Sequence, residues 1–460
     1  MTVATTLIRG GRVIDPASGI DGDFDLLMMN GEIEAVEPSG TIADAAGTSV
    51  IDATGCWVVP GLIDAHVHLR DPGFPEKETI ASGLRAAAAG GFTAVAAMAN
   101  TNPVNDSPAT TKYMLERAGQ AHASRLIPVS AVTHGLAGVE CVNYAAMADA
   151  GARLFSDDGM PVDDPVLLGC AMDEVGRLNF AISLHEEDRL LSCNGAINAG
   201  EVARRLGVPG YSDAAEADRI RRDLALAIGS GAPVHIAHVS ARESLDLIRA
   251  AKRSGARVTC EVTPHHFALD QHAVLRWGPN AKMNPPLRSR NDVAAIHEAI
   301  ADGTIDMIAS DHAPHDPASK HLDRMAGYFD PARDADPLSP DAARDFCAAA
   351  NGIVGLETSL GLALELVHQS LIGASRLVEM MSLAPAALLR LDAGSLATGG
   401  AADITVIDPN MEWAVEPARF LSKSRNTPFA GKQLCGKAIM TIVAGEIVFD
   451  ARKVAGKLER

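Results

Sequence analysis

Residues 63–98 read IDAHVHLRDPGFPEKETIASGLRAAAAGGFTAVAAM and contain one complete strand–helix–strand unit. Residues 63–66 are typical of a buried strand, and residues 78–89 favour a helix that Gly90-Gly91 ends. Residues 92–98 are an apolar run. Because parallel strands need a long crossover between them, usually a helix, this stretch predicts a β-α-β unit of a parallel sheet.

The same alternation continues along the middle of the chain. Further strands are expected at 126–132, 152–156, 180–184, 234–238, 257–262 and 305–310, and further helices at 213–228, 243–252 and 293–301. Eight strands separated by helices predict an α/β fold of the (β/α)8 TIM barrel type.

Both ends of the chain are rich in short strands and turns. Asn30-Gly31 is a strong hairpin signal. Segments 402–407 and 439–443 are strand-like, and Ala444-Gly445, directly after the second of them, indicates a turn. We therefore expect a small β-sandwich built jointly from both termini. The expected division is 1–58 for its N-terminal part, 59–394 for the barrel and 395–460 for its C-terminal part.

Composition narrows the class of partner. The formal charge is −18 over 460 residues, which argues against nucleic-acid binding, so an anionic substrate needs a local positive patch. Seven cysteines without a C-x-x-C pair fit a reducing cytoplasm rather than a disulfide framework. The first fifteen residues lack a signal-peptide pattern, and no apolar run approaches the roughly 20 residues that span a bilayer. We expect a cytoplasmic protein with no membrane partner.

Histidines and aspartates follow the predicted strands. His66 and His68 end the first strand, and residues i and i+2 of a strand point to the same side. Other strands are followed by Asp157-Asp158, His185, His238 and Asp311. Each one alone has a structural interpretation as a hydrogen-bonded core histidine or a turn residue. Five strands with this pattern at the mouth where barrel enzymes carry their chemistry predict a metal site.

The ligand types indicate the metal and the chemistry. Neutral imidazole and carboxylate groups suit Zn²⁺, which lowers the pKa of a bound water to near neutrality. A bridging carboxylate holds two ions roughly 3.5–4 Å apart. Asp311, in the sequence Ser310-Asp311-His312, can bind metal weakly while moving a proton between the attacking water and a leaving nitrogen. Its alternative role is a helix cap or turn residue.

The chain resembles the amidohydrolase superfamily, and its dihydroorotase branch in particular. The likeness spans nearly the whole chain through GLIDAHVHLRDPG (61–73), MANTNP (98–103), FSDDG (155–159), LHEED (184–188), HVS (238–240), MNPPLR (283–288), SDHAPH (310–315), GIVGLET (352–358) and SRNTPF (424–429). His-x-His is common to the superfamily. His-x-His-x-Arg-Asp-Pro-Gly together with Asp-His-Ala-Pro-His is much more specific.

The resemblance implies zinc-dependent, reversible cyclisation of N-carbamoyl-L-aspartate to L-dihydroorotate in de novo pyrimidine biosynthesis. It implies two Zn²⁺ per chain, a metal-bound hydroxide that attacks the ring amide, and Asp311 as general acid/base. The implied ligands are His66, His68 and Asp311 for one zinc, and His185 and His238 for the other, with Asp158 bridging. A homodimer and an association with aspartate transcarbamoylase are the implied protein partners.

The resemblance also implies the substrate contacts. The substrate carboxylate would meet Arg70, Asn100 and His315, and the ring amide Asn284; His68, Asn351 and Gly352 complete the implied set. Arg70 lies two residues beyond His68, shares its side of the chain, and offers a planar fork to a carboxylate. The alternatives are a rim salt bridge for Arg70, turn roles for the asparagines, and an ordinary loop histidine at 315.

The chain departs from the family pattern in three places. Ala99 stands where the family usually has Pro. No lysine beside the fourth strand offers the carboxylated bridge of many amidohydrolases, which favours the aspartate-bridged branch. The segment from His315 to Gly352 is longer than the pattern, and we expect it to form a loop over the mouth that excludes water.

Two other functions fit the same fold. One is hydrolysis of another cyclic amide, as in a hydantoinase or allantoinase, although Arg70 before Asp-Pro-Gly favours an acidic substrate. The other is an inactive scaffold for aspartate transcarbamoylase. The presence of all six expected ligands argues against this function.

Overall fold

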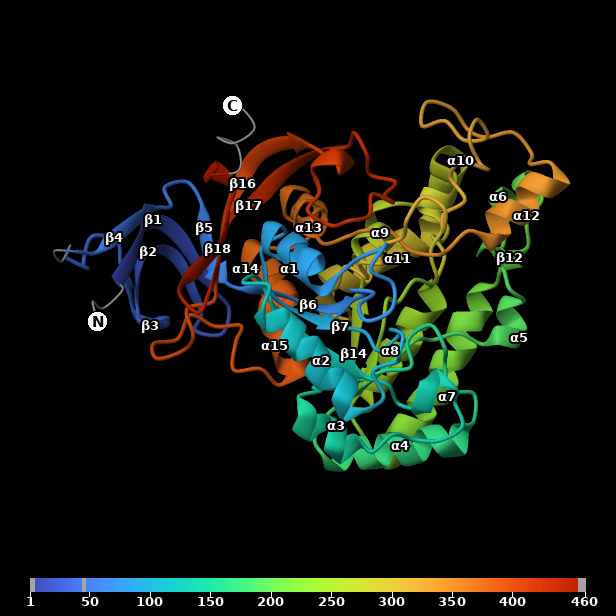
Figure 1. Ribbon diagram of the computed structural model, residues 1–460, viewed down its shortest axis with the longest axis horizontal. Helices are drawn as coiled ribbons and strands as arrows, with labels where there is room; N and C mark the ends of the chain where they lie inside the picture. The colour runs from blue at the N-terminus through green and yellow to red at the C-terminus, as the bar shows by residue number, and fades with distance from the viewer. Residues whose placement is uncertain (1–4, 44–46, 454–460) are drawn as a thin grey trace.

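A computed structural model describes residues 5–43 and 47–453, and it contains a barrel and a separate terminal sheet (Figure 1). The barrel strands are β6 Leu62–Val67, β7 Phe92–Ala97, β8 Arg125–Ser130, β9 Leu154–Phe155, β10 Ile182–Leu184, β13 Val234–Ile236, β14 Val258–Val262 and β15 Met307–Ile308. They pair in chain order and all pairs are parallel. The eight strands expected from the apolar runs are confirmed.

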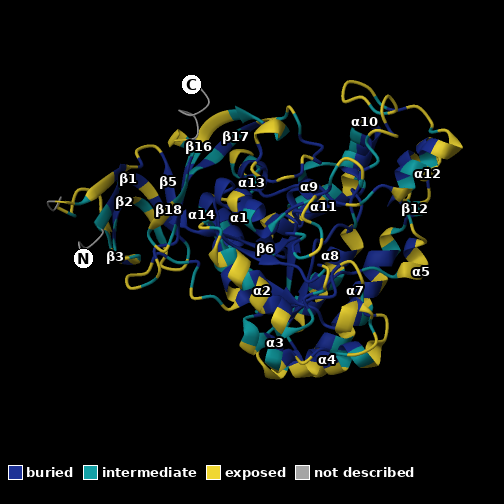
Figure 2. Ribbon diagram, viewed as in Figure 1, coloured by how far each residue is buried: buried dark blue, intermediate teal, exposed yellow. Residues whose placement is uncertain are grey.

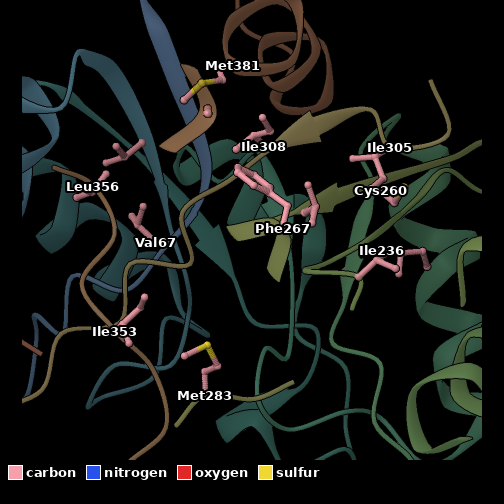
Figure 3. Packing of buried hydrophobic residues seen from close by; sticks show 14 of the residues in the cluster. Val67, Ile236, Cys260, Phe267, Met283, Ile305, Ile308, Ile353, Leu356 and Met381 are labelled. Carbon is pink, nitrogen blue, oxygen red and sulfur yellow. The ribbon is translucent and has the colours of Figure 1, made fainter. Parts of the chain in front are cut away.

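The chain just after β15 closes the barrel. His312 forms a parallel bridge with Val67 of β6 and another with Ile353, and its carbonyl accepts a 2.8 Å hydrogen bond from the His68 backbone N–H. Figure 3 shows Val67 and Ile353 on one side of a buried cluster and other barrel residues across from them. The closing contact therefore lies between the two segments that carry His68 and Asp311.

Helices surround the barrel. They are α1 Ile80–Ala89, α2 Pro108–Gly119, α3 Tyr144–Ala150, α4 Pro165–Arg177, α5 Arg189–Ser192, α6 Glu201–Leu206, α7 Asp213–Ser230, α8 Arg242–Arg253, α9 Pro264–Ala268, α10 Ala273–Trp277, α11 Arg290–Ala301, α12 Pro340–Ala348, α13 Ser359–His368, α14 Ala374–Val378 and α15 Ala384–Leu389. Thr79 and Ser289 begin α1 and α11 with capping boxes, which satisfy backbone N–H groups that the helix leaves unpaired. Figure 2 shows the outer faces of α4 and α5 exposed and the barrel interior buried.

The second sheet combines both ends of the chain. Its strands are β1 Thr5–Asp15, β2 Ile20–Met29, β3 Glu32–Pro38, β4 Ser49–Asp52, β5 Trp57–Pro60, β16 Ile404–Ala414, β17 Gln433–Val443 and β18 Glu446–Asp450. Their order is β18-β17-β16-β5-β1-β2-β3, with β4 also on β1. The expected β-sandwich is confirmed as a separate β-rich unit built from both termini; its strands form one hydrogen-bonded sheet with its own cluster of buried side chains. The division at residues 58/59 and 394/395 remains a prediction.

Both predicted turns join neighbouring strands of this sheet. Asn30 and Gly31 have φ of 53° and 87°, the left-handed values that a tight hairpin needs, and Gly445 ends the β17–β18 turn. A Cβ at Gly31 would lie 2.7 Å from the Ala444 carbonyl oxygen, so the two turns pack too closely for a side chain there.

Shorter elements complete the chain. A two-stranded parallel pair, β11 Ile197–Asn198 and β12 Gly210–Tyr211, was not expected from the sequence. Single-turn segments occur at His134–Leu136, Gly278–Ala281, Glu379–Leu383 and Pro417–Arg419. All seven cysteines are free. Within residues 5–43 and 47–453, no helix combines the length and the apolar character needed to cross a membrane.

Candidate active site

The predicted metal ligands meet at the C-terminal mouth of the barrel. His66, His68 and Asp158 form one group, and Asp158, His185 and His238 form a second. Within each group the ligand atoms lie within 4.8 Å of one another, and all five residues are buried. Because Asp158 belongs to both groups, its carboxylate lies where a bridging ligand would have to be.

Asp311 lies beside the first group. Its Oδ1 is 3.0 Å from His68 Nε2 and 3.7 Å from His66 Nε2. Asp311 has a φ of 45° and His238 a φ of 34°, both in the left-handed region that non-glycine residues rarely adopt. Backbone strain of this kind is concentrated at functional sites, where the surrounding packing maintains it.

Hydrogen bonds at the outer ring nitrogens orient the imidazoles. His66 Nδ1 lies 2.6 Å from Glu261 Oε1, and its Nε2 faces Asp158 Oδ1 at 3.5 Å. His185 has the opposite orientation, with Nδ1 3.4 Å from Asp158 Oδ1 and Nε2 3.5 Å from Glu187 Oε2. A histidine that binds a metal usually donates its other N–H to a carboxylate in this way.

Two buried atoms at the centre have no hydrogen bond within the described part of the chain: His66 Nε2 and Asp158 Oδ1. Leaving buried polar atoms unpaired costs free energy unless another ligand satisfies them. Burial opposes the charge on Asp158, but the adjacent His66, with His185 and His238, holds the pKa of its carboxyl well below the usual value. Imidazole nitrogens around an ionised carboxylate are a donor set that fits a divalent metal ion.

The neighbouring Asp157 is used differently. Its Oδ1 accepts the backbone N–H groups of Val132 and Thr133 at 2.7 and 3.1 Å, and its Oδ2 accepts the Thr133 hydroxyl. Asp157 therefore fixes the loop after β8, and only Asp158 of the pair faces the histidines.

A cavity of about 260 Å³ opens beside the cluster. Every predicted site residue except the fully buried His66 lines it: His68, Arg70, Asn100, Asp158, His185, His238, Asn284, Asp311, His315, Asn351 and Gly352. Gly159 and Ala313 complete the lining. The residues that the strand pattern and the family resemblance pointed to therefore form nearly the whole wall of the cavity.

Arg70 and His315 form the positive side of the cavity. Arg70 Nη2 lies 3.2 Å from His315 Nε2, and Arg70 Nε donates to the Pro314 carbonyl at 3.3 Å. Burial lowers the pKa of Arg70 to about 10, so its guanidinium stays charged at neutral pH. Burial and the Arg70 charge both lower the pKa of His315, so its neutral ring accepts the Arg70 N–H. Arg70 has no carboxylate partner among the described residues, which leaves it available to an anion.

Asn100 and Asn284 point into the site rather than serving as turn residues alone. Asn100 Oδ1 is 2.9 Å from His68 Nδ1, and its Nδ2 is 3.5 Å from Asp158 Oδ2. Asn284 Nδ2 donates to Glu187 Oε2 at 3.0 Å, while its Oδ1 is buried without a hydrogen bond in the described chain. An unpaired amide oxygen in the cavity wall is suited to accept an N–H from a ligand.

Comparison with known proteins identifies the family. The dihydro-orotase-like family profile matches residues 55–244. A dihydroorotase from Syntrophotalea carbinolica is 46% identical over 443 residues, which cover 96% of this chain and 98% of the relative. The chain belongs to the dihydroorotase family. A dihydroorotase from Citrifermentans bemidjiense is 45% identical over 97% of this chain and 99% of its own length.

The solved structures agree on the fold. An L-hydantoinase from Arthrobacter aurescens superposes with a TM-score of 0.83 at 26% identity, covering 97% of this chain and 96% of the other. This neighbour and the parallel barrel make the chain an amidohydrolase TIM barrel. As a dihydroorotase-family member it is an enzyme of the cyclic amidohydrolase type.

The sequence reasoning missed two glutamates of this dihydroorotase-family site. Glu261 is fully buried on β14 between His66 and His235, with Oε2 3.1 Å from His235 Nε2. Glu187 contacts both His185 and Asn284. A usable signal existed for Glu261, because a single acidic residue in the apolar strand VTCEV needs a buried partner.

The long segment after His315 is anchored at its base. Lys320 Nζ donates to the Ala350 carbonyl at 2.8 Å and the Lys282 carbonyl at 3.2 Å, while Lys282 Nζ donates to the Cys347 and Ala349 carbonyls. Of the described residues 316–351, Asn351 is the one that lines the cavity. A closing motion of this segment remains a prediction.

Proposed function

We propose that this enzyme catalyses the reversible cyclisation of N-carbamoyl-L-aspartate to L-dihydroorotate in de novo pyrimidine biosynthesis. The observation that carries the proposal is the buried Arg70 guanidinium, paired with neutral His315 and facing a cavity beside the two metal-ligand groups. A cyclic amide with its own carboxylate fits this combination of charge and size. The names of the relatives support the same substrate.

The donor set supports two metal ions. In this proposal His66, His68 and Asp311 hold one Zn²⁺ and His185 and His238 hold the second, with Asp158 between them. When bound, zinc would polarise the ring carbonyl and lower the pKa of the attacking water. Glu261 and Glu187 would keep the imidazoles of His66 and His185 in the orientation and tautomer that ligation needs.

Asp311 is the proposed general acid/base. Burial opposes its charge, but His68 and His66 hold the pKa of Asp311 below its usual value, so it begins as a carboxylate. In the hydrolytic direction it would accept the proton of the attacking water. As the ring C–N bond breaks, it would deliver that proton to the leaving nitrogen and return to the carboxylate form.

The cavity residues have separate proposed roles in binding. Arg70, Asn100 and His315 would bind the substrate carboxylate, with Arg70 supplying a charged planar fork. Asn284 would accept the ring N–H through its unpaired Oδ1. His68, Asn351 and Gly352 complete the proposed contact set.

A substrate comparison tests the function. Purified zinc-loaded enzyme should convert L-dihydroorotate with a much higher kcat/KM than hydantoin or allantoin. Elemental analysis should find zinc at near two equivalents per chain. Turnover of hydantoin without dihydroorotate turnover would establish a hydantoinase instead. A folded protein without zinc and without activity would be the scaffold.

Location and assembly are also proposals. Seven free cysteines support a reducing cytoplasm. The homodimer and the association with aspartate transcarbamoylase come from the family resemblance, and sedimentation analysis with and without the transcarbamoylase would test both.

A further inference from the structure

The segment Ser424–Phe429 supports the family resemblance, but no role was assigned to it from the sequence. It lies outside the barrel strands, between Pro417–Arg419 and β17. Within it, Asn426 is 3% exposed and is absent from the residues found to line the cavity. Its side chain instead contacts the backbone of two segments that do line it.

Asn426 uses both ends of its amide. Nδ2 donates to the Ala313 carbonyl at 3.0 Å and to the Gly352 carbonyl at 3.1 Å. Oδ1 accepts the backbone N–H of His315 at 3.0 Å. The Asn426 carbonyl also accepts the Val354 N–H at 2.9 Å. One buried residue thus joins the loop after β15 to the segment that follows residue 351.

These two segments touch closely. Gly352 has a φ of 110°, and a Cβ there would lie 2.4 Å from Ala313 Cβ. The two backbones also bond directly, since the Ala313 N–H donates to the Ile353 carbonyl at 2.7 Å. The Asn426 amide adds hydrogen bonds to both segments from the side. The same amide sets the backbone of His315, whose ring receives the Arg70 N–H.

We propose that Asn426 is a positioning residue for the carboxylate-binding side of the cavity. It acts through His315 and Gly352 without touching the substrate. Losing its amide would leave two buried carbonyls and one buried N–H unpaired, and the two backbones would move to satisfy them. The displaced His315 would no longer orient Arg70, so recognition of the carboxylate would weaken more than recognition of the ring. This inference rests on the proposed dihydroorotate substrate.

The test compares Asn426→Ala with Thr427→Val in the zinc-loaded enzyme. Thr427 is the matched control, because its buried Oγ1 accepts only the nearby Phe429 N–H among the contacts described, at 3.2 Å. Calorimetry would measure binding of orotate, a ring with the carboxylate, and of uracil, the same ring without it. Steady-state assays would give KM and kcat for dihydroorotate, and thermal melting would report stability.

We expect Asn426→Ala to weaken the binding of orotate at least about tenfold and to change the binding of uracil less than about threefold. The KM for dihydroorotate should rise by a larger factor than kcat falls. Thr427→Val should lower the melting temperature without this difference between the affinities for orotate and uracil. If Asn426→Ala does not fold, Asn426→Ser, which keeps one hydroxyl donor, should show the same difference. Equal weakening of both rings, or an unchanged orotate affinity, would overturn the positioning role. A wild-type enzyme that neither binds orotate nor converts dihydroorotate would instead disprove the proposed function.

Discussion

Glu261→Gln should weaken metal binding while the barrel stays folded. The carboxylate of Glu261 lies 2.6 Å from His66 Nδ1 and 3.1 Å from His235 Nε2. Burial opposes its charge, but His66 and His235 hold the pKa of Glu261 below its usual range, so the native group is ionised. Glutamine has the same shape and can still accept one N–H, but it has no charge.

The magnitude follows from the contact that is lost. A hydrogen bond to a charged group contributes about 1.5–3 kcal/mol, and about 1.4 kcal/mol is a factor of ten in affinity. Glu261→Gln should therefore raise the zinc Kd by about tenfold to about a hundredfold, the range typical of such outer partners.

Competition with a chromophoric zinc chelator would measure this change, and circular dichroism would monitor the fold. Asp306→Asn is the control. The Asp306 carboxylate binds Lys252 and the backbone N–H of Cys260, which lies next to Glu261 on β14, but it makes no contact with His66. A zinc Kd equal to that of the wild type in Glu261→Gln would refute the reasoning.

Three further predictions concern catalysis, specificity and pH. Asp311→Asn should lower kcat by at least about a hundredfold, the lower range for general acid–base catalysis, with little change in the melting temperature; near-wild-type turnover would exclude proton transfer by Asp311. Arg70→Lys should raise KM for dihydroorotate about tenfold in steady-state assays, because a point charge replaces a fork, and an unchanged KM would argue against carboxylate binding there. Burial lowers the pKa of Lys282 to about 8 from its ordinary 10.5. Between those values the unfolded chain holds the Lys282 proton and the folded chain does not. The unfolding free energy of wild type relative to Lys282→Met should therefore rise with pH, by up to about 1.4 kcal/mol per unit. Urea unfolding at pH 8, 9 and 10 would test this, and a constant difference would contradict it.

Much of the fold could be predicted because its signals are local. The barrel strands lie in mainly apolar stretches of the sequence, and the Asn30-Gly31 turn depends on two neighbouring residues. His66 and His68 share a side through the two-residue period of a strand, so their convergence also follows from the sequence. The assignment of the ligands to two metal ions came from the family motifs rather than from the strand pattern.

Other features depended on contacts between distant parts of the chain. His66 and Glu261 are 195 residues apart, and the Asn426 amide reaches Ala313 across 113 residues. Such pairs form only when the barrel closes, so no local pattern specifies them.

The choice between Asp157 and Asp158 shows the difference most directly. The family spacing pointed to Asp158, but it gave no physical reason. In the folded chain the backbone N–H groups of Val132 and Thr133 donate to Asp157, while the Asp158 carboxylate lies within 3.5 Å of four imidazoles. The sequence by itself determined the barrel strands, the two hairpin turns of the terminal sheet and the types of ligand. Only tertiary structure decided which carboxylates are ionised beside the histidines and which backbone segments form the cavity wall, because both depend on burial and on distances between remote residues.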